Sequence, residues 1–195
     1  MRPARCEPKS DIWPGRGPTK CEQPANHMCN EVLTRLRDDH GRFERLFVEI
    51  ENQCAATENG APVNATYLSA IVAYLREYAL RLHHALEDAI FAKLLEKQPH
   101  FLEIYDLAED HRACRREFEA FALAAIPVDD NFTDLARSYV GNERAHFIAE
   151  EEVFFPYAQR LLLDEQWQAL QASLADDTGN ASNKYPAIAH ILGVV

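Results

Sequence analysis

The chain has 195 residues, of which 47% are hydrophobic, and this is enough for one folded domain with a sizeable core. Its formal net charge of −11 would repel a phosphate backbone, which argues against a nucleic-acid partner. Without an apolar run of roughly 20 residues or the apolar core of a signal peptide, the sequence predicts a cytoplasmic protein with no membrane partner.

Residues 1–28 are predicted to be a Pro-rich, flexible N-terminal extension. They contain five of the ten prolines and show no periodic apolar pattern, which is typical of a segment without a packed core. A single helical domain is predicted to follow over residues 29–177. Residues 178–195 are predicted to form a C-terminal tail.

The first predicted helix begins at Asn30, a residue type that favours the N-cap position. Its apolar stripe has the three-and-four spacing of an amphipathic helix and consists of Leu33, Leu36, Phe43, Phe47 and Ile50. His40 fills the one missing position of that stripe. The segment 56–64, which contains a glycine and a proline, is predicted to end the helix.

A second long helix is predicted over residues 65–97. Its stripe consists of Val72, Leu75, Ala79, His83, Leu86, Glu87, Ile90 and Leu94. A histidine and a glutamate therefore stand four positions apart in a stripe that is otherwise apolar.

The third helix is predicted to include Pro99 in its first turn and to end at Pro127. Its stripe again steps by three and four and consists of Ile104, Leu107, His111, Cys114, Phe118 and Phe121. Like the first helix, it carries one histidine among apolar residues.

The fourth helix is predicted to begin near Asp130 or Asn131 and to be kinked or weakened by Pro156. Its stripe consists of Leu135, Tyr139, Asn142, His146, Ala149, Glu150 and Val153. A short closing helix is predicted over residues 164–177. Four long helices with short connections predict an all-α fold, an up-down-up-down four-helix bundle with a short C-terminal extra helix.

The two halves of the chain repeat one pattern. LRDDHGRFERLF (36–47) resembles LAEDHRACRREF (107–118), and HHALEDAIF, from His83, resembles HFIAEEEVF, from His146. The first helix of each half offers one histidine, and the second helix offers His-x-x-x-Glu. Residues four apart lie about 40° apart around a helix axis and roughly 6 Å apart along it, so each pair can hold the same ion or two adjacent ions.

Helix lengths place these residues at one level of the bundle. Counted from the connecting turns, the histidines of paired helices differ in height by only a few ångströms at about 1.5 Å per residue. The residues that converge on this layer are His40, His83, Glu87, His111, His146 and Glu150.

The composition of this layer predicts a metal centre. Two buried carboxylates without partners would cost several kcal/mol each, and no lysine or arginine shares their stripes. Imidazole and carboxylate suit iron, manganese or zinc, and two carboxylates that can bridge favour a pair of ions over one. The five cysteines are odd in number and form no CxxC pair, which indicates neither a disulfide framework nor a cysteine zinc site.

The pattern H, HxxxE, H, HxxxE over four helices resembles the hemerythrin-like HHE cation-binding domain family, across roughly residues 30–162. The run EEEVFFP after His146 is similar to the usual continuation in that family. The resemblance implies a non-heme di-iron centre with carboxylate and oxo or hydroxo bridges. It also implies that Glu87 and Glu150 bridge the ions and that the four histidines are terminal ligands.

One position departs from the oxygen-carrying hemerythrins. Those proteins have an additional histidine one turn after the third-helix ligand, where this chain has Arg115, and Glu44 occupies the corresponding position after His40. Fewer protein ligands would leave more open coordination positions. We therefore expect a site that reacts with O₂, NO or peroxide, its small-molecule partners, rather than one that carries O₂ reversibly.

Further residues near the pattern could also serve as ligands. His84 points about 100° from His83 and is expected to lie behind the ligands or on the surface. Asp88 and Glu151 could replace the two bridging glutamates. Cys114, about one turn from His111, is expected to pack in the core, and the alternative is a sulfur close to the metals.

A ferritin-like di-iron bundle needs glutamate on two helices and ExxH on the other two, and only Glu143 and His146 fit that pattern. The sequence therefore does not match the ferritin-like arrangement.

The leading functional expectation is a di-iron protein that binds or reduces a small diatomic or peroxide ligand. The alternative is a non-enzymatic iron or oxygen sensor, or an iron store, whose metal site regulates a partner. The pattern itself does not distinguish an enzyme from a binding protein.

Overall fold

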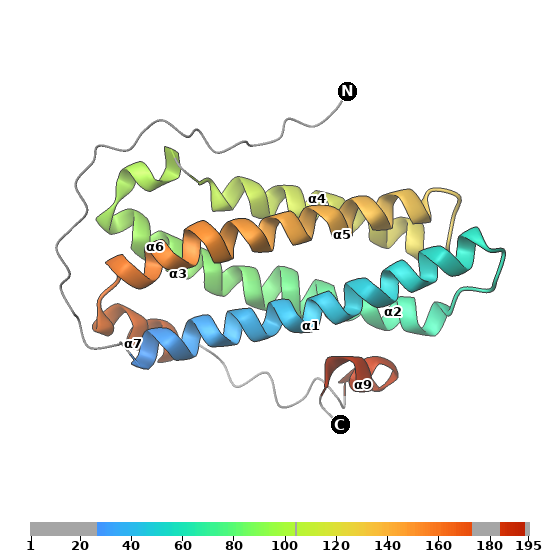
Figure 1. Cartoon of the computed structure of the whole chain (residues 1–195), viewed down its shortest axis with the longest axis horizontal. Helices are drawn as coiled ribbons and strands as arrows, with labels where there is room; N and C mark the ends of the chain where they lie inside the picture. Colours follow the sequence, from blue (N-terminus) through green and yellow to red (C-terminus); the bar gives the residue numbers. More distant parts are fainter. Residues whose placement is uncertain (1–26, 104, 173–183, 194–195) are drawn as a thin grey trace.

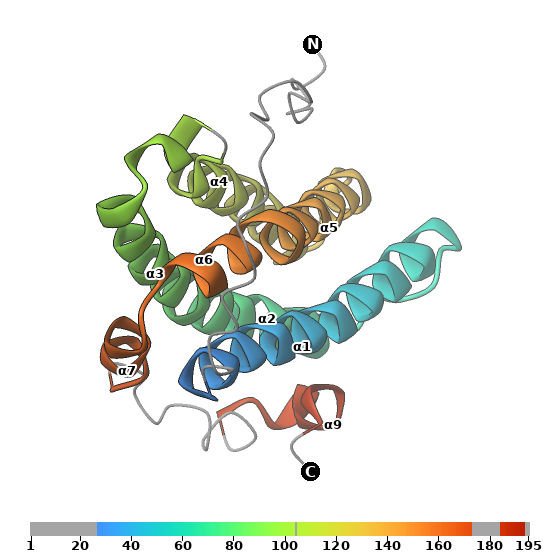
Figure 2. The same cartoon turned by 60° about the vertical axis from the view of Figure 1, so that its left-hand side comes forward.

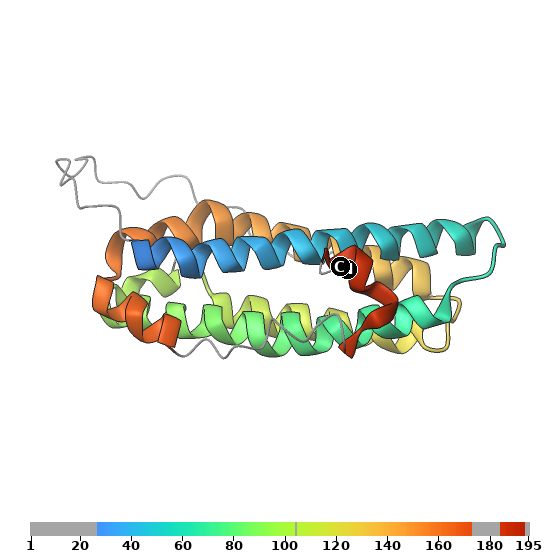
Figure 3. The same cartoon turned by 90° about the horizontal axis from the view of Figure 1, so that it is seen from below.

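The computed structural model describes residues 27–103, 105–172 and 184–193, which form long helices and no strand (Figure 1). Four helical rods lie side by side, and each runs in the opposite direction to the one before it in the chain. They form two layers of two rods (Figures 1 and 3). The first rod is α1 (His27–Glu58), and the third is α4 (Leu107–Ala125). The second rod consists of α2 (Ala65–Tyr74), η1 (Leu75–His83) and α3 (His84–Lys97). The fourth consists of α5 (Phe132–Ala149), η3 (Glu150–Phe154) and α6 (Phe155–Leu161). The predicted all-α bundle is confirmed, and the second rod has the predicted bounds.

The start of α1 differs from the prediction. Helix α1 begins at His27, so Asn30 lies inside the helix and is not its N-cap. No proline or glycine separates His27 from Asn30, and asparagine costs only a few tenths of a kcal/mol more than a better helix former. Residues 1–26 of the predicted extension lie outside the described residues.

The third rod starts later than predicted. Pro99–Glu103 form a separate 3₁₀ turn, η2, and α4 begins at Leu107. The Asp106 side chain accepts a hydrogen bond from the Glu109 backbone N–H at 3.1 Å. This cap satisfies a free donor of the first turn, which explains why the helix begins at Leu107 and not at Pro99.

Two rods contain π-helical segments beside the predicted layer. η1 ends at His83, and η3 begins at Glu150 and precedes Pro156, whose missing N–H interrupts the α-helical ladder. The wider turn of η1 brings neighbouring residues inward together, namely Ala79 with Leu80 and, at its junction with α3, His83 with His84. The predicted disturbance near Pro156 thus takes the form of a π turn.

Two apolar clusters lie on opposite sides of the histidine layer along the bundle. One contains Phe43, Phe47, Phe118, Phe121 and Tyr139, and the other contains Leu33, Leu36, Ile90, Phe154 and Trp167. Each rod passes from one cluster to the other at its histidine. The apolar clusters therefore separate the polar layer from both ends of the bundle.

The C-terminal part adds to this core. Helix α7 (Asp164–Ala172) starts at the predicted residue and buries Trp167 against one end of the bundle (Figure 2); residues 173–183 lie outside the described residues. Beyond them, η5 (Pro186–Ile188) packs against α2 and α9 (Ala189–Leu192) packs against α1. The Arg45 guanidinium donates to the carbonyl oxygens of Ile191, at 2.7 Å, and Leu192, at 3.0 Å. Residues predicted only as a tail are thus packed on the domain, because Ile188 and Leu192 bury their side chains there.

No helix in the described part of the chain is long and apolar enough to cross a membrane.

Candidate metal centre

Each rod contributes one histidine to a single buried layer. His40, from α1, and His111, from α4, are 6% and 7% exposed, while His83 and His146 are 2% and 5% exposed. Glu87, from α3, and Glu150, from η3, are completely buried between them. The structure therefore brings together all six residues that the sequence pattern singled out.

The two glutamates each face both pairs of histidines. Glu87 places Oε1 3.0 Å from His83 Nε2 and Oε2 3.4 Å from His111 Nε2. Glu150 places Oε2 3.3 Å from His40 Nε2 and Oε1 3.2 Å from His146 Nε2. One oxygen of each carboxylate thus serves the His40–His83 side, and the other serves the His111–His146 side. A carboxylate that divides its oxygens in this way can bridge two ions.

The outer nitrogen of each imidazole faces a carboxylate. The Nδ1 pairs are His40 with Glu151 at 3.1 Å, His83 with Asp39 at 3.5 Å, His111 with Asp88 at 2.8 Å, and His146 with Asp110 at 3.6 Å. The Tyr105 hydroxyl also lies 3.3 Å from His146 Nδ1. For His40 and His111 the carboxylate lies within hydrogen-bond distance of Nδ1. Such an acceptor on the outer nitrogen favours the tautomer whose Nε2 lone pair is directed inward, as metal-binding histidines require.

The inner atoms of the layer fit a cation. Within the described chain, both oxygens of Glu87 and Glu150 and the Nε2 atoms of His111 and His146 have no hydrogen-bond partner. Leaving such atoms unpaired in a protein core is costly. Two sets of ligand atoms lie within 4.8 Å of one another and could each hold an ion: one from His40, His83, Glu87 and Glu150, the other from His84, Glu87, His111 and His146.

Without a metal, protons on the imidazoles would balance the negative charge of the buried carboxylates. Burial opposes a charge on each imidazole, but neighbouring carboxylates outweigh it and raise the pKa of His40 to about 9, of His83 to about 10 and of His111 to about 11. Burial would also raise the pKa of Glu87, yet the charge of His83 and the nearby imidazoles of His111 and His40 hold that pKa well below its usual value. Metal binding at neutral pH must therefore release protons from the imidazoles.

These shifts predict how the stability of the metal-free protein depends on pH. The imidazole pKa values in the folded state exceed the ordinary value of 6.5, so their contribution is complete below pH 6.5 and is lost as the pH rises through 9 to 11. Chelator-treated protein should therefore have a lower urea midpoint at pH 10 than at pH 7. Metal-loaded protein, in which ions replace the protons, is the control and should show a smaller decrease; equal decreases would contradict this account.

The sequence left two expected positions for His84, behind the ligands or on the surface. The surface position is wrong, because the side chain is 3% exposed and its ring stacks on His111, a proposed ligand, with centroids 4.0 Å apart. Burial, and then the neighbouring His111, hold the pKa of His84 well below its usual value, which keeps the ring neutral. The adjacent pair His83-His84 was the feature of the sequence that could have indicated this position. Two neighbouring residues can both lie on a broad inward face of a helix and contact different helices.

Four further polar residues of the pattern lie away from the centre of the layer. Asp88 and Glu151 lie on the outer nitrogens of His111 and His40 and not between the histidines. Glu44 forms a two-oxygen ion pair with Arg144 of α5, at 2.6 Å for the shortest contact. Cys114 is buried, and its pKa is raised by burial and then by Glu143, so it remains a thiol.

Glu143 is a buried carboxyl that the predicted stripe did not contain. It is 2% exposed, whereas Asn142, which the stripe did contain, is exposed and donates to Glu117. Burial raises the pKa of Glu143 to about 7. Both residues fit a three-and-four spacing between Tyr139 and His146, so periodicity could not distinguish them.

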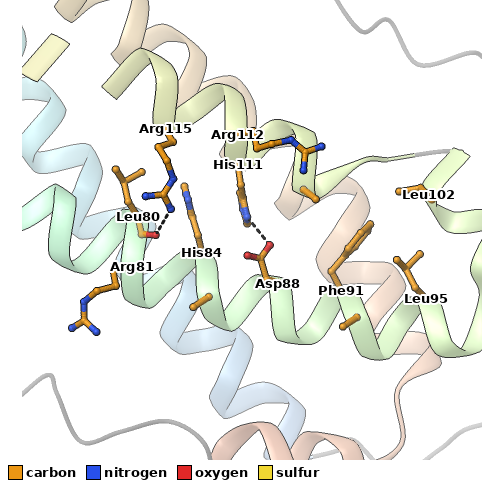
Figure 4. Close-up of a pocket in the computed structure, with 13 residues that line it drawn as sticks. Leu80, Arg81, His84, Asp88, Phe91, Leu95, Leu102, His111, Arg112 and Arg115 are labelled. Atoms are coloured by element: carbon orange, nitrogen blue, oxygen red, sulfur yellow. Dashed lines mark hydrogen bonds and ion pairs between the residues drawn. The ribbon is translucent and has the colours of Figure 1, made fainter. Parts of the chain in front are cut away.

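A pocket of about 650 Å³ lies between α3 and α4 and reaches the layer (Figure 4). His84 and His111 line it, together with Ala108, Arg112 and Arg115. The Arg115 guanidinium donates to the Leu80 carbonyl oxygen at 3.3 Å and does not lie among the inner ligands. The pocket therefore borders the His111 side of the layer.

Comparison with protein families indicates a cation-binding domain. The family model described as "Hemerythrin HHE cation binding domain" matches residues 31–158. No curated protein and no solved structure gives a significant match. The matched segment contains all four rod histidines and both central glutamates.

Proposed function

This chain belongs to the hemerythrin HHE cation-binding domain family, and we propose that it holds two iron ions in the bundle core and binds or reacts there with O₂, NO or peroxide. The proposed ligands are His40, His83, Glu87, His111, His146 and Glu150. The glutamates would bridge the two ions, and the histidines would be terminal ligands. Manganese and zinc share the same ligand preferences and are the alternatives.

One observation carries this proposal: Glu87 and Glu150 each divide their two oxygens between the same two pairs of histidines. A single ion held at one pair of histidines would leave the buried oxygen of each carboxylate that faces the other pair without a partner. Two ions would satisfy all four oxygens.

The surrounding residues suit a reaction with small molecules. When bound, iron would supply the redox chemistry for a diatomic or peroxide ligand. The outer carboxylates hold the imidazoles in one orientation, and the two apolar clusters exclude water from the ends of the layer. The pocket beside His111 admits a small ligand from solvent.

The first test is the metal content. Protein purified after iron-rich expression should contain about two ions per chain, mainly iron, because two bridging carboxylates match a pair of ions. Elemental analysis against protein concentration measures this directly. A single ion, or zinc alone under iron-rich conditions, would contradict the proposal.

The second test is the reaction with O₂ or peroxide. Anaerobic iron(II)-loaded protein, mixed with O₂ or hydrogen peroxide, should change to a stable iron(III) spectrum within minutes. Ala108→Trp, which narrows the pocket, should slow the change, while Ala145→Trp on the exposed face of α5 should not. A spectral change that reverses under vacuum would instead indicate oxygen carriage, and complete inertness would favour the sensor or store.

A further inference from the structure

His84 has no hydrogen-bonding role in the layer. It is 3% exposed, and neither Nδ1 nor Nε2 has a hydrogen-bond partner. Among the buried histidines that the structure describes, it is the one with both ring nitrogens unpaired. Because unpaired buried polar atoms are costly, the free nitrogens of His84 call for a ligand.

The unpaired nitrogens lie beside the proposed ligands. One ligand atom each from His84, Glu87, His111 and His146 lies within 4.8 Å of the others. His84 stacks parallel to His111, with an interplanar angle of 4°, and lies edge-on to His146 with centroids 5.6 Å apart. Three imidazoles from three helices thus surround one side of the centre.

We propose that His84 is a further metal ligand, which completes a three-histidine position on the pocket side of the centre. This inference rests on the proposed function, since it assigns a seventh protein ligand to the same pair of ions. The pocket-side position takes His84, His111 and His146, and the enclosed position takes His40 and His83. Glu87 and Glu150 bridge both, so the two positions differ by one imidazole.

The position of His84 explains how the centre accommodates Arg115. Unlike the oxygen-carrying hemerythrins, this chain has no histidine on α4 at residue 115. In Figure 4, His84 extends from α3 toward α4 between Arg115 and His111. A histidine from the facing helix therefore occupies the space next to His111, while Arg115 binds the Leu80 carbonyl oxygen.

A purely packing role against His111 is the competing explanation for His84. His84→Phe separates the two roles, because phenylalanine keeps an aromatic ring for the stack but offers no ligand atom. His84→Ala removes both the ring and the nitrogen. His190→Ala is the matched control, since His190 is exposed and contacts Tyr67, far from the layer in sequence and fold.

Anaerobic titration with iron(II), followed by desalting and elemental analysis, tests the proposal without measuring activity. Wild type and His190→Ala should retain two ions, while both His84 variants should retain one and bind the second at least about tenfold more weakly. Because His84 lines the pocket, free imidazole should restore the second ion to the Ala variant but not to the Phe variant.

Three results would overturn the assignment. His84 is not a ligand if both His84 variants bind two ions with wild-type affinity. The same conclusion follows if the Phe variant alone retains the second ion. Loss of the second ion without imidazole rescue, accompanied by an altered circular dichroism spectrum in both variants, would show a structural role. Wild type that binds one ion or none would instead contradict the proposed function itself.

Discussion

Replacing Glu150 by alanine is expected to remove most of the bound metal from an otherwise folded chain. Glu150 is fully buried, and its two oxygens face His40 on one side and His146 on the other. If Glu150 bridges two ions as proposed, its loss would remove a ligand from both at once, and Glu87→Ala should have the same effect. We expect the loss of metal to exceed the roughly 10- to 100-fold loss of affinity that follows from changing an outer partner.

The chain provides a matched series for this prediction, because Glu150, Glu151 and Glu152 are consecutive. Glu151 contacts the outer nitrogen of His40 and the Arg37 guanidinium, outside the centre of the layer, and Glu152 is exposed. Metal content after dialysis should therefore be lowest for Glu150→Ala, intermediate for Glu151→Ala and unchanged for Glu152→Ala. Equal metal content in all three variants would rule out Glu150 as a ligand.

Removing the metal is expected to destabilise the fold strongly. An ion that binds only the folded state adds about 4 kcal/mol to the free energy of unfolding when its concentration is 1,000 times its dissociation constant. Two ions in a shared site would each contribute in this way. The chelated protein would also keep Glu87, Glu150 and four histidines in its core, balanced only by protons.

Urea denaturation before and after treatment with a reductant and an iron chelator measures this effect. Glu150→Ala is the control, because a chain that binds little metal should lose little stability on chelation. Restoring iron(II) should restore the midpoint of wild type but not that of the variant. A wild-type midpoint that chelation leaves unchanged would mean that the layer is stable without its ions.

The sequence predicted the bundle and the membership of its central layer. The three-and-four spacing is a local property of each helix, so the stripes around His40, His83 and His111 could be identified before any helix was placed against another. The duplicated HxxxE pattern then indicated two carboxylates at the same height. The family match over residues 31–158 agrees with the resemblance based on that pattern.

Local spacing did not fix every orientation. Asn142 and Glu143 both satisfy the helical period, and only the packing of α5 against α4 turned Glu143 inward. The π-helical η1 likewise widened one turn, so that His83 faces α1 while His84 faces α4. The helical period of 3.6 residues does not predict these orientations. In each pair the two residues lie near the edge of a broad inward face, so either could point into the core.

The carboxylates on the outer nitrogens of the histidines depended wholly on tertiary structure. Glu151 approaches His40 and Asp110 approaches His146 from neighbouring rods, across 111 and 36 positions of the chain. The sequence by itself determined that one histidine from each rod and the two HxxxE glutamates enter the layer, because helical periodicity acts within one helix. The packing of the rods decided which nitrogen faces which carboxylate and placed His84 beside the centre, because those contacts depend on the rotation and height of one helix against another.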